Sequence, residues 1–324
     1  MKQTAVLVVY FLLVSWSVVS SLLYWGEETL AAKVLSRPKK IVEVQRFYEV
    51  EGFYLDPGGS KVYYLANQLK IYDRTLFLFE NPRGEVYSER IGTTDYKAEK
   101  GRLDQKKALL TFENNAEFLN QDFDLLTDKA LYHLEDEIVE GFGNVDSRVS
   151  DPKSKDVIKA KSEYIKMYQE RRHVHYAENV VGKIIRPRPY DEVTYFWGQT
   201  MDVDFFDRMA ELQRDVRVKS QNFDIKARKG ELFLDNFHNE LKYYVFYDDV
   251  EVDQKYQEQD GTWAMRKAYG EKLEGYPSEE KIVMSGTPKV IQGQDVIRGN
   301  LITLRQNIGL VEVEDSTASF IYED

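Results

Sequence analysis

Two histidines separated by a single residue are the clearest candidates for metal chemistry in this sequence. His173 and His175 would project from one face of a strand, because side chains two residues apart share a face. A zinc site needs a third ligand, and none follows at a recognisable spacing. His133 and His238 are isolated, and the absence of cysteine excludes thiolate ligands, disulfides and cysteine nucleophiles. We therefore interpret the pair as solvent-facing strand residues and expect no metal.

Carboxylate pairs offer a second possible chemistry. Asp122 with Asp124, and Asp202 with Asp204, could serve a glycosidase if two carboxyl groups faced one cleft. Acids at alternating positions are found far more often on the exposed face of a strand than in a catalytic pair. The GFGNVD segment at 141–146 lacks the third glycine of a dinucleotide-binding loop, and no GxSxG motif is present. The sequence predicts neither an enzyme nor a bound cofactor.

The charge of the chain excludes nucleic acid as a partner. The 324 residues carry a formal net charge of −11, and no lysine- or arginine-rich run forms a basic footprint. The mean hydropathy is −0.51 although the chain opens on a long apolar stretch. The remainder must therefore be a polar, water-exposed body.

The N-terminal stretch is predicted to be a membrane anchor. Residues 4–25 contain no charged side chain, and 22 residues of helix span about 33 Å, close to the thickness of the hydrocarbon core. We expect a short cytoplasmic tail at 1–3, a transmembrane helix at 4–25 and a linker at 26–40. A cleavable signal peptide, with small residues at 18–20, is the alternative. Both interpretations place the remaining body across the membrane.

The sequence of this body predicts an all-β protein. Short apolar runs recur every 8–12 residues and are separated by turn-forming pairs such as Asn114-Asn115 and Asp248-Asp249. The segment 205–216 fits either a short helix or a pair of strands.

An eight-residue frame repeats along this body. Its order is apolar, any, small, two polar, usually small, any, apolar, and a second strand follows each copy. A two-stranded unit cannot bury its apolar face alone, so neighbouring units must stack around one continuous interior. The four clear copies are YKAEKGRL at 96–103, LLTDKALY at 125–132, IKAKSEYI at 158–165 and IKARKGEL at 225–232.

An apolar N-terminal span followed by such repeats resembles the lipopolysaccharide-transport (Lpt) family, with its OstA-type β-jellyrolls. The segments that carry the resemblance are 62–87, 122–148 and 223–252. The resemblance covers about residues 41–320 and implies a V-shaped, open jellyroll, in tandem or continuous. An LptC-like jellyroll at 41–186 would be extended by an LptA/OstA-like jellyroll at 187–324.

The resemblance implies a non-enzymatic function in lipopolysaccharide transport. The jellyroll would hold the acyl chains in its apolar groove and pass them across the periplasm, with the chain anchored in the inner membrane. The implied partners are the inner-membrane Lpt ABC transporter complex and other periplasmic or outer-membrane Lpt jellyrolls, joined by edge-strand pairing. We expect the groove to be lined by Leu125, Tyr132, Ile158, Ile165, Phe223, Ile225, Leu232, Leu234, Val245 and Tyr247.

Two other functions remain open on the sequence. A structural or protein-binding envelope scaffold would have a closed interior filled by its own side chains. A carbohydrate-active enzyme would need an inward-facing pair of carboxylates.

Overall fold

The computed structural model describes residues 43–56, 59–88, 92–150, 157–185, 193–234, 241–258, 261–305, 310–315 and 317–319. The chain divides into two units, Met1–Glu43 and Val44–Asp324. The predicted tail, transmembrane helix and linker at 1–40 lie outside the described residues. Among the described residues, no helix combines the length and the apolar character needed to cross a membrane.

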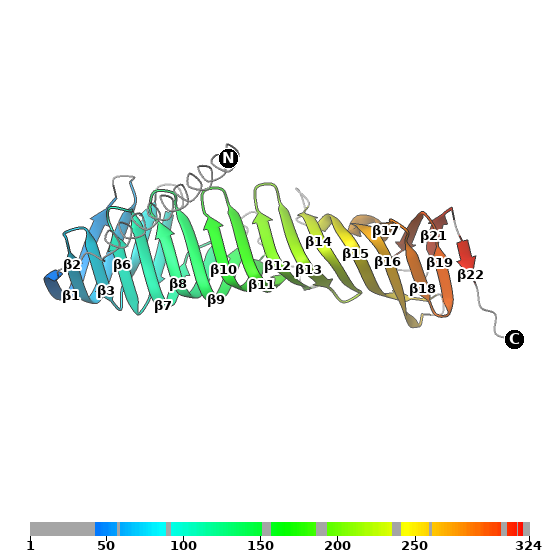
Figure 1. Cartoon of the computed structure of the whole chain (residues 1–324), viewed down its shortest axis with the longest axis horizontal. Coiled ribbons are helices and arrows are strands. Elements are labelled where there is room, and N and C mark those ends of the chain that lie inside the picture. Colours follow the sequence, from blue (N-terminus) through cyan, green and yellow to red (C-terminus); the bar gives the residue numbers. More distant parts are fainter. Residues whose placement is uncertain are drawn as a thin grey trace, which may run out of the picture. The chain divides into compact units, whose positions relative to one another are not determined.

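The second unit is built from 22 strands and a single short 3-10 helix among its described residues, which confirms the all-β prediction (Figure 1). The 3-10 helix is η1 (Pro277–Glu279). The strands are β1 (Glu43–Leu55), β2 (Lys61–Tyr72), β3 (Leu76–Glu80), β4 (Arg83–Ser88), β5 (Gly92–Lys97), β6 (Lys100–Asp104), β7 (Leu109–Leu119), β8 (Phe123–His133), β9 (Ile138–Ser150), β10 (Val157–Tyr168), β11 (His173–Ile185), β12 (Thr194–Asp204), β13 (Met209–Lys219), β14 (Phe223–Leu234), β15 (Leu241–Gln257), β16 (Trp263–Tyr276), β17 (Lys281–Ser285), β18 (Lys289–Gln292), β19 (Asp295–Arg298), β20 (Leu301–Arg305), β21 (Val311–Glu314) and β22 (Thr317–Ser319).

The strands follow one another along the unit in chain order. From β7 to β16 each strand pairs antiparallel with the next. The segment 205–216 therefore belongs to the β12–β13 strand pair and is not helical. Between β11 and β12, Val181 pairs with Trp197 and Ile184 with Thr194, so the sheet is continuous from one side of position 186 to the other.

The long strands bend in their middle, and every second one from β7 to β15 carries a pair of left-handed residues at this corner. Asn114 and Asn115 of β7 have φ angles of 63° and 55°, and Asp248 and Asp249 of β15 have φ angles of 62° and 53°. The strand register shifts at the same places, between Glu113 and Ala116 in β7 for example. These pairs were predicted to be turns that separate strands, and that prediction is wrong. They are bulges inside strands that fold the sheet over, because a bulge bends the strand that carries it.

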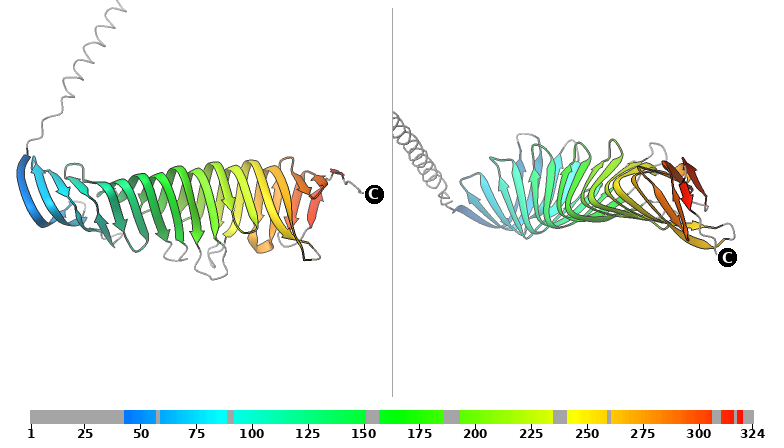
Figure 2. Two further views of the ribbon diagram at one scale, coloured as in Figure 1. Left: turned by 90° about the horizontal axis from the view of Figure 1, so that it is seen from below. Right: turned by 45° about the vertical axis from the view of Figure 1, so that its right-hand side comes forward.

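The corner divides the sheet into two facing halves (Figure 2). We call sheet I the half that contains residues 145–150, 157–162 and 180–185, and sheet II the half that contains 138–142, 164–168 and 173–177. The rings of Phe112 and Phe118, on either side of the bend in β7, meet edge to face with centroids 5.3 Å apart. The two halves of one strand thus face each other across the interior.

The eight-residue frame spans this corner. In the copy at 125–132, Leu125 on sheet I and Tyr132 on sheet II are both buried, and the two polar positions, Asp128 and Lys129, are both exposed. Two consecutive outward residues shift the in-out alternation by one, which keeps the apolar side chains inward on both halves. The frame therefore corresponds to the bend in the sheet and not to a complete strand.

The left-handed corner gives a test of this architecture at Glu178, an exposed residue with a φ of 65°. A β-branched residue is strained there, whereas glycine is not. We expect Glu178→Val to lower the free energy of unfolding by about 1–2 kcal/mol, and Glu178→Gly to change it by less than about 0.5 kcal/mol. Urea unfolding of both variants measures the difference. Equal losses in the two variants would contradict the bent-strand corner.

Candidate functional site: the interior between the two sheets

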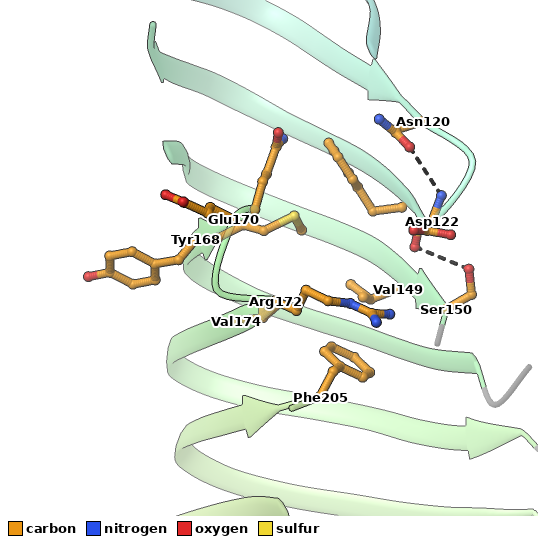
Figure 3. Close-up of a pocket in the computed structure, with 12 residues that line it drawn as sticks. Asn120, Asp122, Val149, Ser150, Tyr168, Glu170, Arg172, Val174 and Phe205 are labelled. Carbon is orange, nitrogen blue, oxygen red and sulfur yellow. Dashed lines mark hydrogen bonds between the residues drawn. The ribbon is translucent and has the colours of Figure 1, made fainter. Parts of the chain in front are cut away.

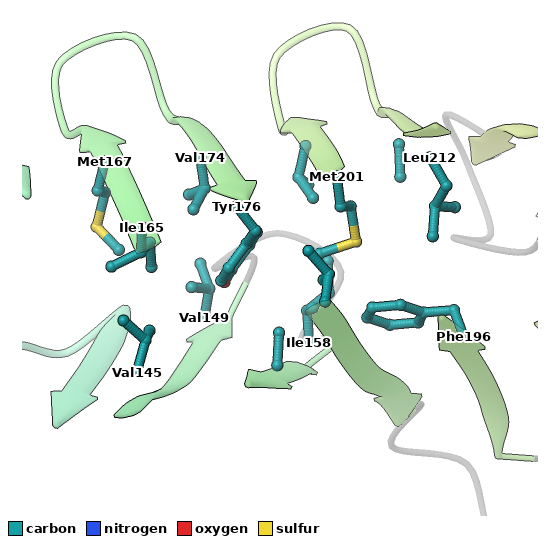
Figure 4. Packing of buried hydrophobic residues seen from close by; sticks show 14 of the residues in the cluster. Val145, Val149, Ile158, Ile165, Met167, Val174, Tyr176, Phe196, Met201 and Leu212 are labelled. Atoms are coloured by element: carbon teal, nitrogen blue, oxygen red, sulfur yellow. The ribbon is translucent and has the colours of Figure 1, made fainter. Parts of the chain in front are cut away.

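The interior between sheets I and II is one continuous apolar cluster. It runs from Val62 in β2 to Leu304 in β20. Figure 4 shows the middle of it, where Val149, Ile158 and Phe196 of sheet I point toward side chains of sheet II. The cluster continues across the β11–β12 pairing, with Tyr176 and Val180 on β11 and Phe196 and Met201 on β12.

Six of the ten predicted groove residues lie in this cluster. They come from β8, β10 and β14, the three strands that contain copies of the repeat after the first. The first apolar residue of each copy belongs to sheet I and the last to sheet II, so the two face each other. These residues are Leu125, Tyr132, Ile158, Ile165, Ile225 and Leu232, each with at most 6% of its surface exposed.

The other four predicted residues are placed differently. Phe223 packs against the cluster and is only partly buried. Leu234 ends β14, where it pairs with Leu241. Val245 is buried, but it lies outside the interior cluster.

Tyr247 lies on the outer face of β15. Its hydroxyl donates to Glu231, with 3.4 Å between the oxygens, and Lys229 and Lys272 lie over its ring. Tyr244 and Phe246 occupy the interior positions of this strand instead. We expected the odd-numbered residues of this part of β15 to face the interior, and the even-numbered ones do. The sequence could not distinguish the two faces, because both are apolar or aromatic.

The interior is filled by the protein's own side chains. The buried hydroxyls of Ser147 on sheet I and Tyr176 on sheet II lie 3.0 Å apart and share a hydrogen bond across it. Burial raises the pKa of Tyr176 to about 12, and burial also raises the pKa of Tyr132. The sequence predicted an open groove along this interior. In the described residues the two sheets are in contact instead.

A pocket opens into the interior at the free rims of the two sheets (Figure 3). It has a volume of about 370 Å³. The turn between β7 and β8 forms one wall. There the backbone carbonyl of Asp122 accepts from the Ser150 hydroxyl, and the backbone N–H of Asp122 donates to the side-chain oxygen of Asn120. The β10–β11 turn forms the other wall, and Arg172 extends from it into the space between the rims (Figure 3). We call this pocket the mouth.

The floor of the mouth is apolar and continuous with the interior cluster. Its apolar lining is Phe123, Val149, Met167, Val174 and Phe205. None of the five was predicted from the sequence, because they lie at strand ends, outside the eight-residue frame. The signal for most of these residues was their position near the turns that join consecutive strands, at 120–122, 169–172 and 205–208.

A buried arginine, which was not predicted from the sequence either, lies at the C-terminal end of the interior. Arg266 is 1% exposed, and its Nε donates to Gln254 Oε1 over 2.9 Å. Its guanidinium also donates to the carbonyl groups of Arg305 and Leu310 and stacks over the ring of Tyr256. Burial lowers its pKa to about 10. The mainly apolar interior thus gives way to a polar cluster here.

The residues with possible metal or acid-base chemistry are on the outer surface. His175 Nδ1 and His173 Nε2 lie 2.8 Å and 3.3 Å from the same Asp202 oxygen. Asp204 accepts from the backbone N–H groups of Phe206 and Asp207 in the β12–β13 turn. In the parts of the chain that the structure describes, no group of three histidine or acidic side chains is arranged to hold a metal ion.

The two remaining motifs have structural roles. Asp124 forms an ion pair with Arg148, with 3.3 Å between the charged atoms. In GFGNVD, Gly143 and Asn144 have φ angles of 74° and 46° and form the corner of β9. The left-handed backbone at this corner explains why a glycine stands at position 143, and no nucleotide site is needed to explain it.

Residues 198–309 match the family of the LptA/(LptD N-terminal domain) LPS transport protein. The match covers β13 to β20, the C-terminal part of the continuous sheet. This part of the chain is therefore similar in sequence to lipopolysaccharide-transport domains.

Comparison with solved structures finds LptH of Pseudomonas aeruginosa, the LptA-homologous periplasmic component of its lipopolysaccharide transport device. The alignment covers 40% of this chain and 95% of LptH, with 15% sequence identity and a TM-score of 0.36. No curated protein matches the sequence.

The His175–Asp202 pair gives a pH test of the outer face. The hydrogen bond to Asp202 raises the pKa of His175, against the opposing effects of burial and of Lys166. The resulting stabilisation is complete below the unfolded-state pKa of histidine, about 6.5, and is lost as the pH rises through the higher folded-state pKa.

We expect Asp202→Asn to lower the free energy of unfolding more at pH 5 than at pH 9, by at most about 1 kcal/mol because the pair is partly exposed. Urea unfolding at the two pH values measures this difference. A larger loss at pH 9 would contradict the assignment.

Proposed function

We propose that this chain carries lipopolysaccharide without chemically changing it, and that the acyl chains occupy the interior between sheets I and II. The continuous apolar cluster from β2 to β20 is the observation that carries the proposal. The match of residues 198–309 to lipopolysaccharide-transport domains supports it. Burying acyl chains there gains about 0.8 kcal/mol for each methylene group removed from water.

The mouth offers the acyl chains a way between the sheets. Its floor joins the interior cluster, and its rims are two turns, which separate at lower cost than the paired strands behind them. Because the interior is filled, binding requires sheets I and II to move apart about the corner. The acyl chains would then replace the contacts that the two sheets make with each other.

The exposed edge of β1 supports assembly with other proteins of the same fold. Among the described strands, β1 pairs only with β2. Its exposed apolar residues are Phe47, Tyr48, Phe53 and Leu55. An unpaired edge of this kind accepts a further strand by β-augmentation.

We also propose a place for the chain in the cell envelope. Residues 4–25 would anchor it in the inner membrane, with the body in the periplasm, where it receives lipid from the Lpt ABC transporter complex. Residues 41–186 would act as the LptC-like part and 187–324 as the LptA-like part. Other periplasmic or outer-membrane Lpt jellyrolls would join at a sheet edge.

The filled interior favours a second candidate function, an envelope scaffold that binds proteins and no lipid. Residues such as Tyr132, Ile165 and Ile225 are completely buried, as in an ordinary protein core. The two functions differ in whether lipid reaches these residues.

A photo-crosslinking amino acid at Ile225 distinguishes the two functions. Ile225 points into the interior and is fully buried, whereas the neighbouring Lys226 is exposed on the outer face and pairs with Glu251. We expect the crosslinker at position 225 to capture lipopolysaccharide in cells and the crosslinker at 226 not to. Immunoblotting for lipopolysaccharide on the purified chain measures both.

The matched position makes the result specific, because 225 and 226 share a strand and differ only in the face they present. Equal labelling at both positions, or no labelling at 225, would contradict acyl-chain binding in the interior. If the crosslinker at position 225 captured no lipopolysaccharide in a protein that is folded and membrane-associated, the result would favour the scaffold function.

A further inference from the structure

A row of basic side chains follows the outer face of sheet I close to its rim. Arg148 of β9 pairs in register with Lys159 of β10, and Lys159 pairs with Lys183 of β11. Lys183 pairs with Tyr195 of β12, which pairs with Lys219 of β13. Five neighbouring strands thus present four cations and one aromatic ring at one level. We call Arg148, Lys159, Lys183, Tyr195 and Lys219 the basic row.

Three of the four cations form no ion pair among the residues that the structure describes. Arg148 pairs with Asp124, but Lys159, Lys183 and Lys219 form no ion pair with any residue that the structure describes. The acid opposite Lys219 is Asp224, and both of its oxygens accept from Arg217, at 2.8 Å and 2.6 Å. Arg217 and, to a smaller degree, Lys219 lower the pKa of Asp224.

The basic row places like charges directly opposite each other on neighbouring strands. Elsewhere on the same face, Lys161 pairs with Asp146 and Lys226 pairs with Glu251. Like charges directly opposite each other on neighbouring strands destabilise a sheet. A chain of net charge −11 nevertheless places Arg148, Lys159 and Lys183 side by side. Asp124 compensates the charge of Arg148, but no described residue forms an ion pair with Lys159 or Lys183, and this favours an anionic partner.

The basic row lies directly outside the apolar interior. On each of its five strands, the neighbouring residue points inward and contacts the cluster. These inward residues are Val149, Ile158, Ile184, Phe196 and Val218. Val149 also lines the mouth, so the row begins where the mouth opens on sheet I. An amphiphile with its chains between the sheets would have its head group at this rim.

An aromatic contact extends the row toward the corner. The rings of Tyr195 and Trp197 stack on the outer face with centroids 6.4 Å apart, and the guanidinium of Arg217 lies over Trp197. Tyr195 is 45% exposed and Val181, opposite Trp197, is 43% exposed. Flat rings beside cations suit a phosphorylated sugar, which offers both a ring face and anionic groups.

We infer that the basic row binds the phosphorylated saccharide head group of the lipid whose acyl chains enter at the mouth. This inference rests on the proposed function and adds to it a site for the head group. Lys159, Lys183 and Lys219 contribute the unpaired positive charge, and Tyr195 contributes a stacking surface. The row would hold the head group outside while the chains remain inside.

The test uses the full chain in nonionic detergent with the crosslinker at Ile225 and purified lipopolysaccharide as the probe. The triple variant Lys159→Gln, Lys183→Gln and Lys219→Gln is compared with a control that carries the same charge change. The control replaces Lys97, Lys129 and Lys267, each held in an ion pair, by glutamine.

We expect the triple variant to need about tenfold or more lipopolysaccharide for half-maximal labelling, because each lysine near an anionic surface contributes about fivefold at low salt. The difference should disappear in 0.5 M salt or with phosphatase-treated lipopolysaccharide. The control should bind like the unmodified chain. The triple variant should also unfold at the same or a higher temperature, because like-charge repulsion is removed.

The outcomes separate the two proposals. Unchanged labelling in the triple variant would overturn the inference and leave acyl-chain binding intact. No labelling at Ile225 in any protein would overturn the proposed function, and the inference with it. Equal loss of binding to vesicles of an anionic phospholipid without lipopolysaccharide would assign the row to a bilayer surface and contradict the inference.

Discussion

The bend of the long strands at the corner, where every second strand carries a pair of left-handed residues, is the constraint on which the rest of the structure depends. It brings the two halves of one strand face to face, as Phe112 and Phe118 show. The corners also bond to one another along the unit: Asn81 N–H donates to Glu99 over 2.7 Å, and Glu99 N–H donates to Asn114 over 3.1 Å. Adding strands lengthens the fold without changing its cross-section, so the interior continues from β2 to β20.

This geometry also explains how a filled interior can serve a carrier. The two halves are covalently joined and hydrogen-bonded at the corner, whereas at the rims only turns face each other across the mouth. Side-chain contacts between the halves are nondirectional, and acyl chains can replace them with similar hydrophobic burial. Opening about the corner therefore breaks no strand pairing. The polar cluster at Arg266 would limit how far acyl chains extend toward the C-terminal end.

The sequence predicted the strands and six interior residues because the repeat frame records burial on both halves. It could not distinguish a corner from a turn, since Asn114-Asn115 and Asp248-Asp249 favour the left-handed conformation that both require. Tyr247 was misplaced because β15 is apolar in both phases, and Arg266 gave no signal because its interior position depends on the later strands. The basic row is invisible in the sequence: its members lie on separate strands, and only the register brings them together. The division at 186 and the anchor at 4–25 remain predictions.

The opening of the two sheets tests the central claim most directly. Spin labels at Gln121 and Arg171, both exposed on the turns that face each other across the mouth, report the separation of sheets I and II. Pulsed electron paramagnetic resonance on the full chain, with and without lipopolysaccharide, measures the distance between them. Acyl-chain binding between the sheets predicts a longer distance when lipopolysaccharide is present. An unchanged distance in a sample shown to contain bound lipopolysaccharide would contradict it.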